Sequence, residues 1–565
     1  MLSNKLIKQY AAFCFAVTVC FLTVCASRTA PAKPLEHKEH LNASAEDVQA
    51  WRDMKFGLFV HWGPVSLMGT EIGWSRGGER RGRKGTGEIP VDVYDNLYRS
   101  FYPARFDAKK WVDIAKAAGM KYLVFTTKHH DGFCMFDSDL TDYKITNGPF
   151  RRDIVKELAD ACHGGGLKLG FYYSQPDWHH PDYRTDRHSR YIEYLHGQLR
   201  ELCTRYGKVD VIFFDGLGGK PEDWDSQKLI EMCRRLQRQV IINNRTGLPG
   251  DYDTPEQRIG KFNKERPWES CITICRQWAW KPGDTMKSLK QCIQTLVRVA
   301  GGDGNLLLNV GPMPTGEIEP RQVERLSQMG AWLGKYGESI YDVRGGPFIG
   351  SAWLTSTHKE NRIYLHVFDW YGDSLLLPPI DKKVLAASLL TGGEVHLAQD
   401  KKQIVVTVGQ RYQQEIDTII VLELDSPAAE VRPVEVFSHS VAYKKKARAS
   451  SIYADRPENA PERAFDEDCA TCWRSAEKDG WLEVDLGRVQ IVDTAMVWDG
   501  GDYFGAEEFE LSYEAGDRWE PIAKGTGPVQ PKILRFEPVR GGKFRLKISR
   551  KNRQVRICEL QLFGP

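Results

Sequence analysis

One pattern repeats between residues 55 and 336: a helix, a glycine, a short apolar strand and then a polar side chain. In the first clear copy, Asp107 is an N-cap acid, the helix ends at Gly119, and the strand Tyr122–Thr127 follows. Further strands are predicted at 55–63, 167–174, 209–216, 240–244, 271–275 and 305–310. Helices alternating with buried strands indicate parallel winding, and about seven strands favour a (β/α) TIM-like barrel over an open sheet.

After about residue 342 the pattern changes to short strands without helices, which predicts an antiparallel β-sandwich. The segment 425–433 has the composition of a linker, and strands and turns resume beyond it. We therefore predict five parts, with these boundaries: a signal peptide (1–26), a linker (27–47), a catalytic barrel (48–343), a β-sandwich (344–432) and a C-terminal β-sandwich (438–565).

The charge balance argues against a nucleic-acid partner. The net charge is +3, and lysine and arginine are spread throughout the chain. The densest basic run, Arg76 to Lys84, is rich in glycine and interrupted by Glu79. For this run a solvated loop is favoured over a loop that faces substrate.

The amino terminus resembles an export signal. Lys5 and Lys8 precede an apolar run, 11–25, that is shorter than the ~20 residues of a membrane-spanning helix. Cleavage after Ala26 would give a periplasmic or secreted protein, whereas the LTVC segment at 22–25 loosely resembles a lipoprotein box and leaves an outer-surface lipid anchor open. Cys469 and Cys472 supply only half of a zinc site, so structural or surface thiols are favoured.

The predicted strand ends carry an unusual set of side chains. The run VDVIFFDG ends in Asp215, and the carboxyl ends of barrel strands are where catalytic groups lie. The other strand ends carry His61, His129, His130, Asp131, Tyr172, Tyr173, Asn244 and Arg245. Imidazole, guanidinium and aromatic groups together suit a polar, ring-shaped ligand such as a sugar. A metal site at 129–131 is disfavoured because neighbouring strand residues point to opposite faces.

Hydrolysis of a glycoside requires a second carboxyl, ~5 to 5.5 Å from the first if the anomeric configuration is retained. Five acids follow Arg245 in the chain: Asp251, Asp253, Glu256, Glu265 and Glu269. The pattern alone leaves Glu256 and Glu269 equally placed as the partner of Asp215.

Six motifs occur in one order: FGLFVHWG, TTKHHDGF, LGFYYSQPDWHHPDY, FFDG, DYDTPEQ and GGDGNLLLNVGP. Together they resemble glycoside hydrolase family 29, the retaining α-L-fucosidases, across residues 48–343. The resemblance implies that Asp215 is the nucleophile and Glu256 the acid/base, with no metal or organic cofactor in catalysis. The residues that it implies bind the sugar are His61, Trp74, His129, His130, Tyr172, Arg245 and Trp278.

The implied substrates are fucosylated oligosaccharides or glycoconjugates. The segment YSQPDWHHPDY is similar to the branch of the family that prefers α-1,3 and α-1,4 linkages. Two alternatives remain: a non-catalytic glycan-binding surface protein, which is a different class of protein, and a retaining glycosidase for another sugar such as galactose. The presence of both Asp215 and Glu256 favours catalysis.

The C-terminal segment contains ARASSIY, PERAFDEDCATCW, WLEVDLG and ICELQLFG. These stretches resemble the discoidin-type β-sandwich family, which includes galactose-binding carbohydrate modules. The resemblance implies a structural calcium at Asp466, Asp468, Thr471 and Glu559. Whether Trp498, Tyr503 and Phe504 bind sugar or pack inside the domain stays open.

Overall fold

The computed structural model describes residues 41–564, except for 352, 371, 437, 469–470, 500–507, 527–531 and 551–553. The predicted signal peptide, most of the linker after it, and Cys469, Tyr503 and Phe504 lie outside the described residues. Within the described residues, no helix combines the length and the apolar character that crossing a membrane requires.

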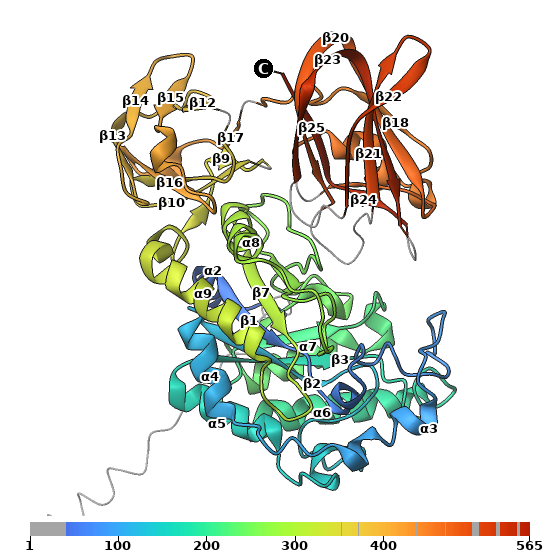
Figure 1. Ribbon diagram of the computed structural model, residues 1–565. Coiled ribbons are helices and arrows are strands. Elements are labelled where there is room, and N and C mark those ends of the chain that lie inside the picture. The colour runs from blue at the N-terminus through green and yellow to red at the C-terminus, as the bar shows by residue number, and fades with distance from the viewer. Residues whose placement is uncertain are drawn as a thin grey trace, which may run out of the picture. The chain divides into compact units, whose positions relative to one another are not determined.

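The first part of the described chain is built on one parallel sheet, with the strand order β5-β4-β3-β2-β1-β7-β6 (Figure 1). The strands are β1 (Phe56–Val60), β2 (Tyr122–Lys128), β3 (Lys168–Ser174), β4 (Val211–Asp215), β5 (Ile241–Ile242), β6 (Glu269–Thr273) and β7 (Asn305–Val310). The helices are α2 (Ala45–Met54), α3 (Val91–Tyr94), α4 (Ala108–Ala117), α5 (Ile154–Gly165), α6 (His188–Arg205), α7 (Ser226–Leu236), α8 (Leu289–Gly301) and α9 (Pro320–Tyr336). The predicted TIM-like barrel is confirmed.

An irregular segment lies where β5 and β6 would otherwise meet. Isolated parallel bridges join Asn243 to Tyr252, Asp253 to Trp268 and Glu256 to Cys271. The strand predicted at 240–244 is shorter than expected because the chain turns at Asn244, and the Asn243 side-chain amide bonds both backbone groups of Phe214 in place of the ladder. This irregular stretch brings Glu256 to the barrel.

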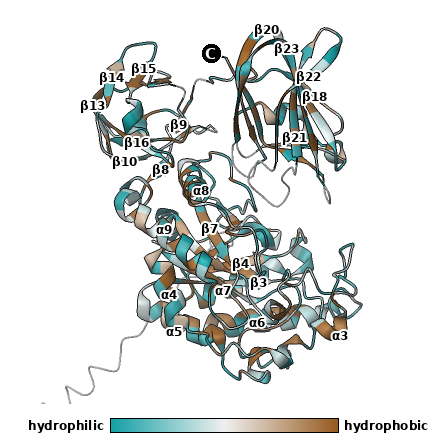
Figure 2. Cartoon of the chain, in the orientation of Figure 1, coloured by the Kyte–Doolittle hydropathy of each residue, from teal (hydrophilic) through white to brown (hydrophobic). Residues whose placement is uncertain are grey.

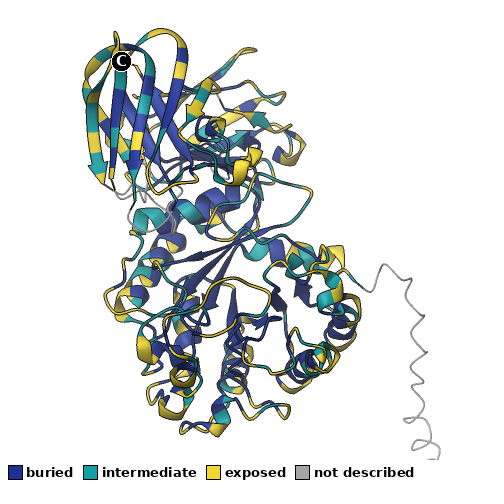
Figure 3. Ribbon diagram, turned by 90° about the vertical axis from the view of Figure 1, so that its right-hand side faces the viewer, coloured by how far each residue is buried: buried dark blue, intermediate teal, exposed yellow. Residues whose placement is uncertain are grey.

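The helices begin where the sequence places their caps. The Asp107 carboxylate accepts from the backbone N–H of Lys110 at 3.0 Å, and that of Asp153 accepts from Lys156 at 2.9 Å. Each such cap contributes about 1 kcal/mol to helix stability. Hydrophobic residues concentrate on the barrel strands (Figure 2), and Figure 3 shows these strands buried while exposed residues lie on the surrounding helices and loops. Every residue of β1, β2 and β4 is buried.

The remaining chain is β-structure, as predicted. A five-stranded antiparallel sheet has the order β13-β16-β11-β10-β8, and a three-stranded sheet has the order β12-β15-β14. Their strands are β8 (Arg344–Gly345), β10 (Leu354–Lys359), β11 (Arg362–Val367), β12 (Ser374–Leu377), β13 (Val384–Leu389), β14 (His396–Gln399), β15 (Ile404–Thr407) and β16 (Thr418–Leu424). Two short strands, β9 (Phe348–Ile349) and β17 (Val434–Glu435), pair in parallel.

The C-terminal domain has a sheet in the order β18-β20-β23-β21-β22, with β25 also paired to β20. Its strands are β18 (Lys446–Ala449), β19 (Trp473–Arg474), β20 (Gly480–Trp498), β21 (Glu508–Ala515), β22 (Arg518–Thr526), β23 (Lys532–Ser549), β24 (Arg556–Ile557) and β25 (Glu559–Phe563). Its core is separate from that of the barrel and includes Phe465, Trp473 and Phe544. A discoidin-like sandwich therefore follows the barrel and the smaller sandwich.

Candidate active site

Asp215 is the last residue of β4, so its carboxylate lies at the carboxyl edge of the barrel sheet. Its Oδ2 accepts a hydrogen bond from the Tyr172 hydroxyl at 2.9 Å and lies 3.4 Å from Nε2 of His130. Its Oδ1 accepts from Nη1 of Arg245 at 3.1 Å. Three neighbouring side chains therefore orient this carboxylate.

The electrostatic environment keeps Asp215 ionised. Burial by itself raises the pKa of this carboxyl, but the Arg245 guanidinium, His130 and the Tyr172 hydroxyl outweigh that effect and hold the pKa below its usual value. Burial lowers the pKa of His61 to about 3 and that of His130 to about 4. At neutral pH the site thus combines an ionised carboxylate with uncharged imidazoles, which can each donate and accept hydrogen bonds.

Arg245 binds both carboxylates to which the family resemblance assigns catalytic roles, Asp215 and Glu256. It lies in the short 3₁₀ turn Asn244–Thr246, and its Nη1 donates to Asp215 while its Nη2 donates to Oε2 of Glu256 at 2.8 Å. Its Nε donates to the Thr254 hydroxyl at 2.9 Å, and its guanidinium carbon lies 5.2 Å from the centre of the Phe213 ring. One fixed guanidinium therefore holds both acids at the same cavity.

The other acids of the segment after Arg245 lie elsewhere. Glu269 is the first residue of β6, at the amino edge of the sheet, where its Oε2 accepts from the hydroxyl of Tyr122, the first residue of β2. Burial raises the pKa of Glu269 to about 8. Asp251 is bound to Arg234 and to backbone amides. Glu269 is thus separated from Asp215 by the length of the strands.

The remaining acids of that set do not reach the cavity either. Asp253 accepts hydrogen bonds from the Asn244 side-chain amide at 3.0 Å and from the Arg266 guanidinium. Glu265 is exposed in the loop that precedes β6. Of the five acids, Glu256 is the one that lines the cavity with Asp215.

The three histidines cluster with one another and with the Tyr172 ring next to Asp215. His61 follows β1, and its Nδ1 lies 2.7 Å from Oδ1 of Asn309 on β7. His129 follows β2 and stacks on the Tyr172 ring, with centres 5.4 Å apart and planes within 7°. His130 contacts the Ser174 hydroxyl through Nδ1 at 2.6 Å. The partners Asn309 and Ser174 are polar residues at or next to the ends of apolar strands, and this position in the sequence is the signal that indicates them.

Two tryptophans pack against these histidines. The Trp278 ring centre lies 4.8 Å from that of His61, and the Trp74 ring is edge-on to His130 at 5.5 Å. Glu71, which the sequence did not single out, joins the loops that carry them: its carboxylate accepts from the backbone N–H groups of Trp278 at 3.0 Å and Ala279 at 3.1 Å. Burial raises the pKa of Glu71 to about 7.

The basic run Arg76–Lys84 is not simply a solvated loop, and the prediction is corrected on this point. Arg76 and Arg80 are buried, with 5% and 9% of their surface exposed. Arg76 forms a bidentate pair with Asp95, and Arg80 packs over the rings of Trp74 and Trp178. Arg83 lines the same cavity as Asp215 and Glu256. Glycines let the run fold back onto the barrel, so its charges reach both the interior and the cavity.

The cavity has a volume of about 470 Å³, and its lining includes Asp215, Asn244, Arg245, Thr254 and Glu256. An ionised carboxylate lies beside a second, partly exposed one, and uncharged imidazoles and aromatic faces surround them. Such a pocket can bind a hydroxylated ring and cleave an acetal bond at its anomeric carbon. The fold and this site define a glycoside hydrolase.

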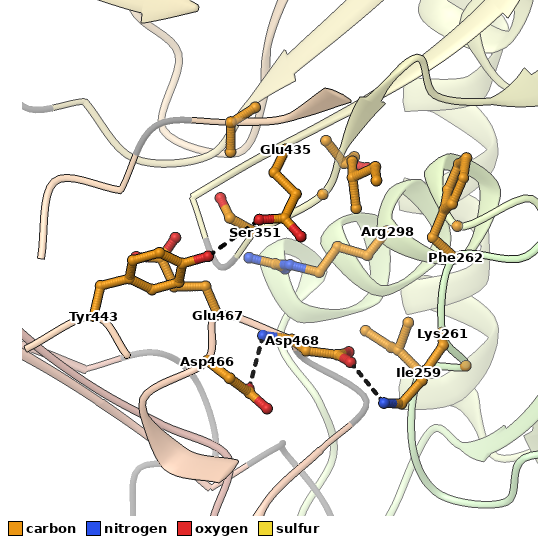
Figure 4. Close-up of a pocket in the computed structure, with 16 residues that line it drawn as sticks. Ile259, Lys261, Phe262, Arg298, Ser351, Glu435, Tyr443, Asp466, Glu467 and Asp468 are labelled. Carbon is orange, nitrogen blue, oxygen red and sulfur yellow. Dashed lines mark hydrogen bonds and ion pairs between the residues drawn. The ribbon is translucent and has the colours of Figure 1, made fainter. Parts of the chain in front are cut away.

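The residues implied to hold calcium lie in the C-terminal domain. Asp466, Glu467 and Asp468 are consecutive in one loop (Figure 4), and the Thr471 hydroxyl contacts both carboxylate oxygens of Asp466, at 2.8 and 2.9 Å. Glu559 is fully buried, and within the described residues neither of its carboxylate oxygens has a hydrogen-bond partner. Burial, together with the charges of the three acids in the loop, raises its pKa well above the usual value.

These acids have a chemistry that fits a bound cation, because a buried carboxylate without partners is costly unless a positive charge compensates it. Among the described residues, however, no group of three or more histidine, cysteine, aspartate or glutamate side chains is arranged to hold a metal ion.

Comparisons with known proteins agree with the class that the site defines. The family model described as Alpha-L-fucosidase matches residues 23–338, and the model described as F5/8 type C domain matches residues 446–560. Plasma alpha-L-fucosidase of Homo sapiens is 30% identical over 380 residues, which cover 61% of this chain and 81% of that protein. Tissue alpha-L-fucosidase of Bos taurus is 31% identical over 385 residues, which cover 60% and 80% respectively.

Solved structures are also similar to this chain. Alpha-L-fucosidase isoenzyme 1 from Paenibacillus thiaminolyticus is 37% identical with a TM-score of 0.62, covering 67% of this chain and 99% of that one. A Bacteroides thetaiotaomicron GH29 α-L-fucosidase, trapped as a covalent intermediate with 2-fluoro-fucosyl fluoride, is 29% identical with a TM-score of 0.61, covering 70% and 100%. The chain belongs to the α-L-fucosidase family, and it is a glycoside hydrolase.

Proposed function

We propose that this enzyme is an exo-acting, retaining α-L-fucosidase that releases terminal fucose by double displacement. The observation that carries the proposal is the Arg245 guanidinium, which binds Asp215 and Glu256 at once. A single guanidinium that binds two carboxylates holds both at one cavity, as a mechanism with a carboxylate nucleophile and a carboxyl acid/base requires. The trapped covalent intermediate of the Bacteroides relative supports the same mechanism here.

In the first step, Asp215 attacks the anomeric carbon while Glu256, protonated, gives its proton to the departing glycosidic oxygen. The C–O bond to the leaving group breaks, and a fucosyl ester of Asp215 forms. In the second step Glu256, now a carboxylate, takes a proton from water, which attacks the anomeric carbon and displaces Asp215. Net retention follows from two inversions. Two carboxyls supply this chemistry without an added cofactor.

The roles are divided by environment. The Asp215 side chain is 11% exposed and the Glu256 side chain 44% exposed, so Glu256 can reach a leaving group and water at the cavity mouth. His61, His129, His130 and Tyr172 would hold the fucose hydroxyls, with Trp74 and Trp278 as apolar walls. The motif YSQPDWHHPDY supports α-1,3- and α-1,4-linked fucose on branched glycans as the substrate.

The test compares the intact protein with Asp215→Ala and Glu256→Ala on an aryl α-L-fucoside. We expect Asp215→Ala to lose turnover, and Glu256→Ala to recover it when azide is added and the leaving group is activated. Glu269→Gln is the matched control, because this buried acid lies at the other end of the barrel, and it should keep its activity. Release of β-L-fucose as the first product, observed by NMR, would contradict retention.

We further propose a structural calcium in the C-terminal domain, supported by the unpartnered Glu559 carboxylate beside Asp466 and Asp468. Ca²⁺ should raise the unfolding temperature of the intact protein, and Glu559→Gln should abolish the increase. An equal increase in the variant would contradict the proposal. Sugar binding by this domain is also a proposal, which binding of glycans without fucose by the catalytically inactive Asp215→Ala protein would test.

Export is a proposal that rests on the amino-terminal sequence. Lys5 and Lys8 before the apolar run support transfer to the periplasm, the medium or the outer surface. The mass of the mature chain tests it: a polypeptide that begins at Ser27 indicates a soluble product, and one that begins at a lipid-modified Cys25 indicates an anchored product. A chain that retains Met1 would contradict export.

A further inference from the structure

Arg83 lies at the mouth of the active-site cavity on the basic loop Arg76–Lys84. It lines the cavity that also contains Asp215 and Glu256. Its guanidinium carbon is 5.2 Å from the centre of the Trp74 ring, and its Nη1 donates to the Leu217 carbonyl at 3.3 Å. The guanidinium therefore lies beside the Trp74 ring, and an aromatic face is a favourable neighbour for a planar cation.

Two arginines that precede Arg83 anchor the loop that carries it. Arg76 binds both carboxylate oxygens of Asp95, at 2.6 and 2.7 Å. Nη1 of Arg81 donates to the backbone carbonyls of His180, Pro181 and Tyr183 at distances of 2.7 to 3.1 Å. These contacts restrict the positions that Arg83 can adopt, so its place at the cavity mouth is part of the fold.

The charge of Arg83 is not balanced by a carboxylate. Among the described residues no aspartate or glutamate forms an ion pair with it, whereas Arg245 already pairs with both Asp215 and Glu256. The three histidines next to Asp215 are uncharged near neutral pH, because burial lowers the pKa of each. When Glu256 carries the proton that it donates in the first step, the cavity lining has two guanidinium cations and one carboxylate. One positive charge then remains at the mouth.

We propose that Arg83 determines specificity on the leaving-group side by binding an anionic substituent, a sulfate or a carboxylate, on the saccharide from which fucose is released. The inference rests on the roles proposed above, because Glu256 marks the side on which the leaving group departs. A guanidinium offers paired N–H donors whose spacing matches two oxygens of a sulfate or a carboxylate. One of its donors is bound to Leu217, and the group keeps further N–H donors for a ligand.

The experiment measures kcat/KM of the full-length protein on three substrates: a neutral fucosylated trisaccharide, the same trisaccharide with a sulfate on its galactose, and the same trisaccharide with a terminal sialic acid. The readout is the ratio of each anionic substrate to the neutral one, so that any loss common to all substrates cancels. We expect a ratio of about ten for at least one anion, in keeping with a charge-assisted contact. The anion that is preferred distinguishes sulfate from carboxylate.

Arg83→Gln keeps a hydrogen-bond donor for Leu217 but removes the charge, and it should bring the ratio close to one. Arg83→Lys should retain part of the preference, and Lys84→Gln, on the neighbouring exposed residue, should keep the wild-type ratio. A second measurement uses only the wild-type protein: added salt should lower kcat/KM for the anionic substrate more than for the neutral one.

A wild-type ratio of one or less for both anions would overturn the proposal, as would a preference that survives in Arg83→Gln. These results are distinct from failure of the proposed function, because in that case the wild-type protein would hydrolyse neither the neutral trisaccharide nor an aryl fucoside.

Discussion

At the scale of single residues, the two carboxyls proposed as catalytic, Asp215 and Glu256, share the Arg245 guanidinium but differ in exposure, since only Asp215 is buried. Asp215 is enclosed by Tyr172, His130 and Arg245, and this environment favours its ionised form. Glu256 shares the guanidinium but is about half exposed, so it can exchange a proton with the leaving group and with water. Two carboxyls in different surroundings can therefore take the different roles of nucleophile and proton donor.

Tyr172→Phe tests how Asp215 is kept ionised. The change removes the 2.9 Å hydrogen bond to Oδ2, which stabilises the carboxylate form, so the pKa of Asp215 should rise. Because the proposed nucleophile Asp215 must be a carboxylate to react, the acidic limb of the kcat/KM profile should move to higher pH. A bond to a charged group is worth about 1.5 to 3 kcal/mol, which corresponds to a loss of about 10- to 100-fold in kcat/KM.

Tyr173→Phe is the matched control, because the Tyr173 hydroxyl donates to Gln198 at 2.8 Å and not to the active-site carboxylates. This variant should keep the wild-type acidic limb. If Tyr172→Phe gave a pH profile that superimposes on that of the wild type, the hydroxyl would have no part in the ionisation of Asp215.

At the scale of elements, the sequence predicts strands, caps and strand-end residues because these follow from local periodicity and side-chain chemistry. Asp107, Asp153 and Asp215 occupy the helix starts and the strand end expected for them. The choice between Glu256 and Glu269 as the partner of Asp215 could not be made from such local patterns. The strand predicted from residue 271 begins at Glu269, and those two extra residues place Glu269 at the amino edge of the sheet. The start of a strand depends on pairing with its neighbours, which one sequence does not show.

The basic loop was misjudged for a related reason. Its glycines and charges are typical of solvated loops, and nothing local indicates that Arg76 would find Asp95 or that Arg80 would pack on Trp74. Likewise, Glu71 contacts Trp278 across more than 200 residues of chain. Contacts of this kind depend on how barrel loops meet at the carboxyl edge, and they account for most of the site residues that the sequence did not reveal.

Glu71→Ala tests whether this contact between loops positions the pocket wall. Without the carboxylate, the backbone N–H groups of Trp278 and Ala279 lose their acceptor, so the Trp278 loop should move more freely. We expect KM for an aryl fucoside to rise about tenfold, with a smaller change in kcat, and faster amide hydrogen exchange at 276–280. The control is Glu79→Ala, since the Glu79 side chain is 80% exposed. Unchanged exchange and KM in Glu71→Ala would show that other contacts fix the loop.

At the scale of the whole molecule, the barrel separates chemistry at its carboxyl edge from a buried acid at its amino edge. Glu269 has no exposed surface, and its contact with the Tyr122 hydroxyl does not offset the cost of burying a charge. The pKa of about 8 means that the folded protein binds a proton there more tightly than the unfolded chain does. The stability of the barrel is therefore linked to pH through a residue outside the active site.

The sign of this linkage gives the last prediction. Because the folded pKa of Glu269 lies above the usual glutamate pKa of 4.5, its stabilising contribution is complete below about pH 4.5 and is lost as the pH rises through 8. The loss is about 1.4 kcal/mol for each pKa unit between the two states.

Glu269→Gln stays uncharged and can still accept from Tyr122, so its melting temperature relative to wild type should increase from pH 5 to pH 9. Groups that titrate in both proteins, such as Glu71, cancel in this difference. If the difference in melting temperature between Glu269→Gln and wild type stayed flat or fell across this range, Glu269 would be ionised in the folded barrel. Glu265→Gln, which changes an exposed acid, is the control for the loss of one carboxyl.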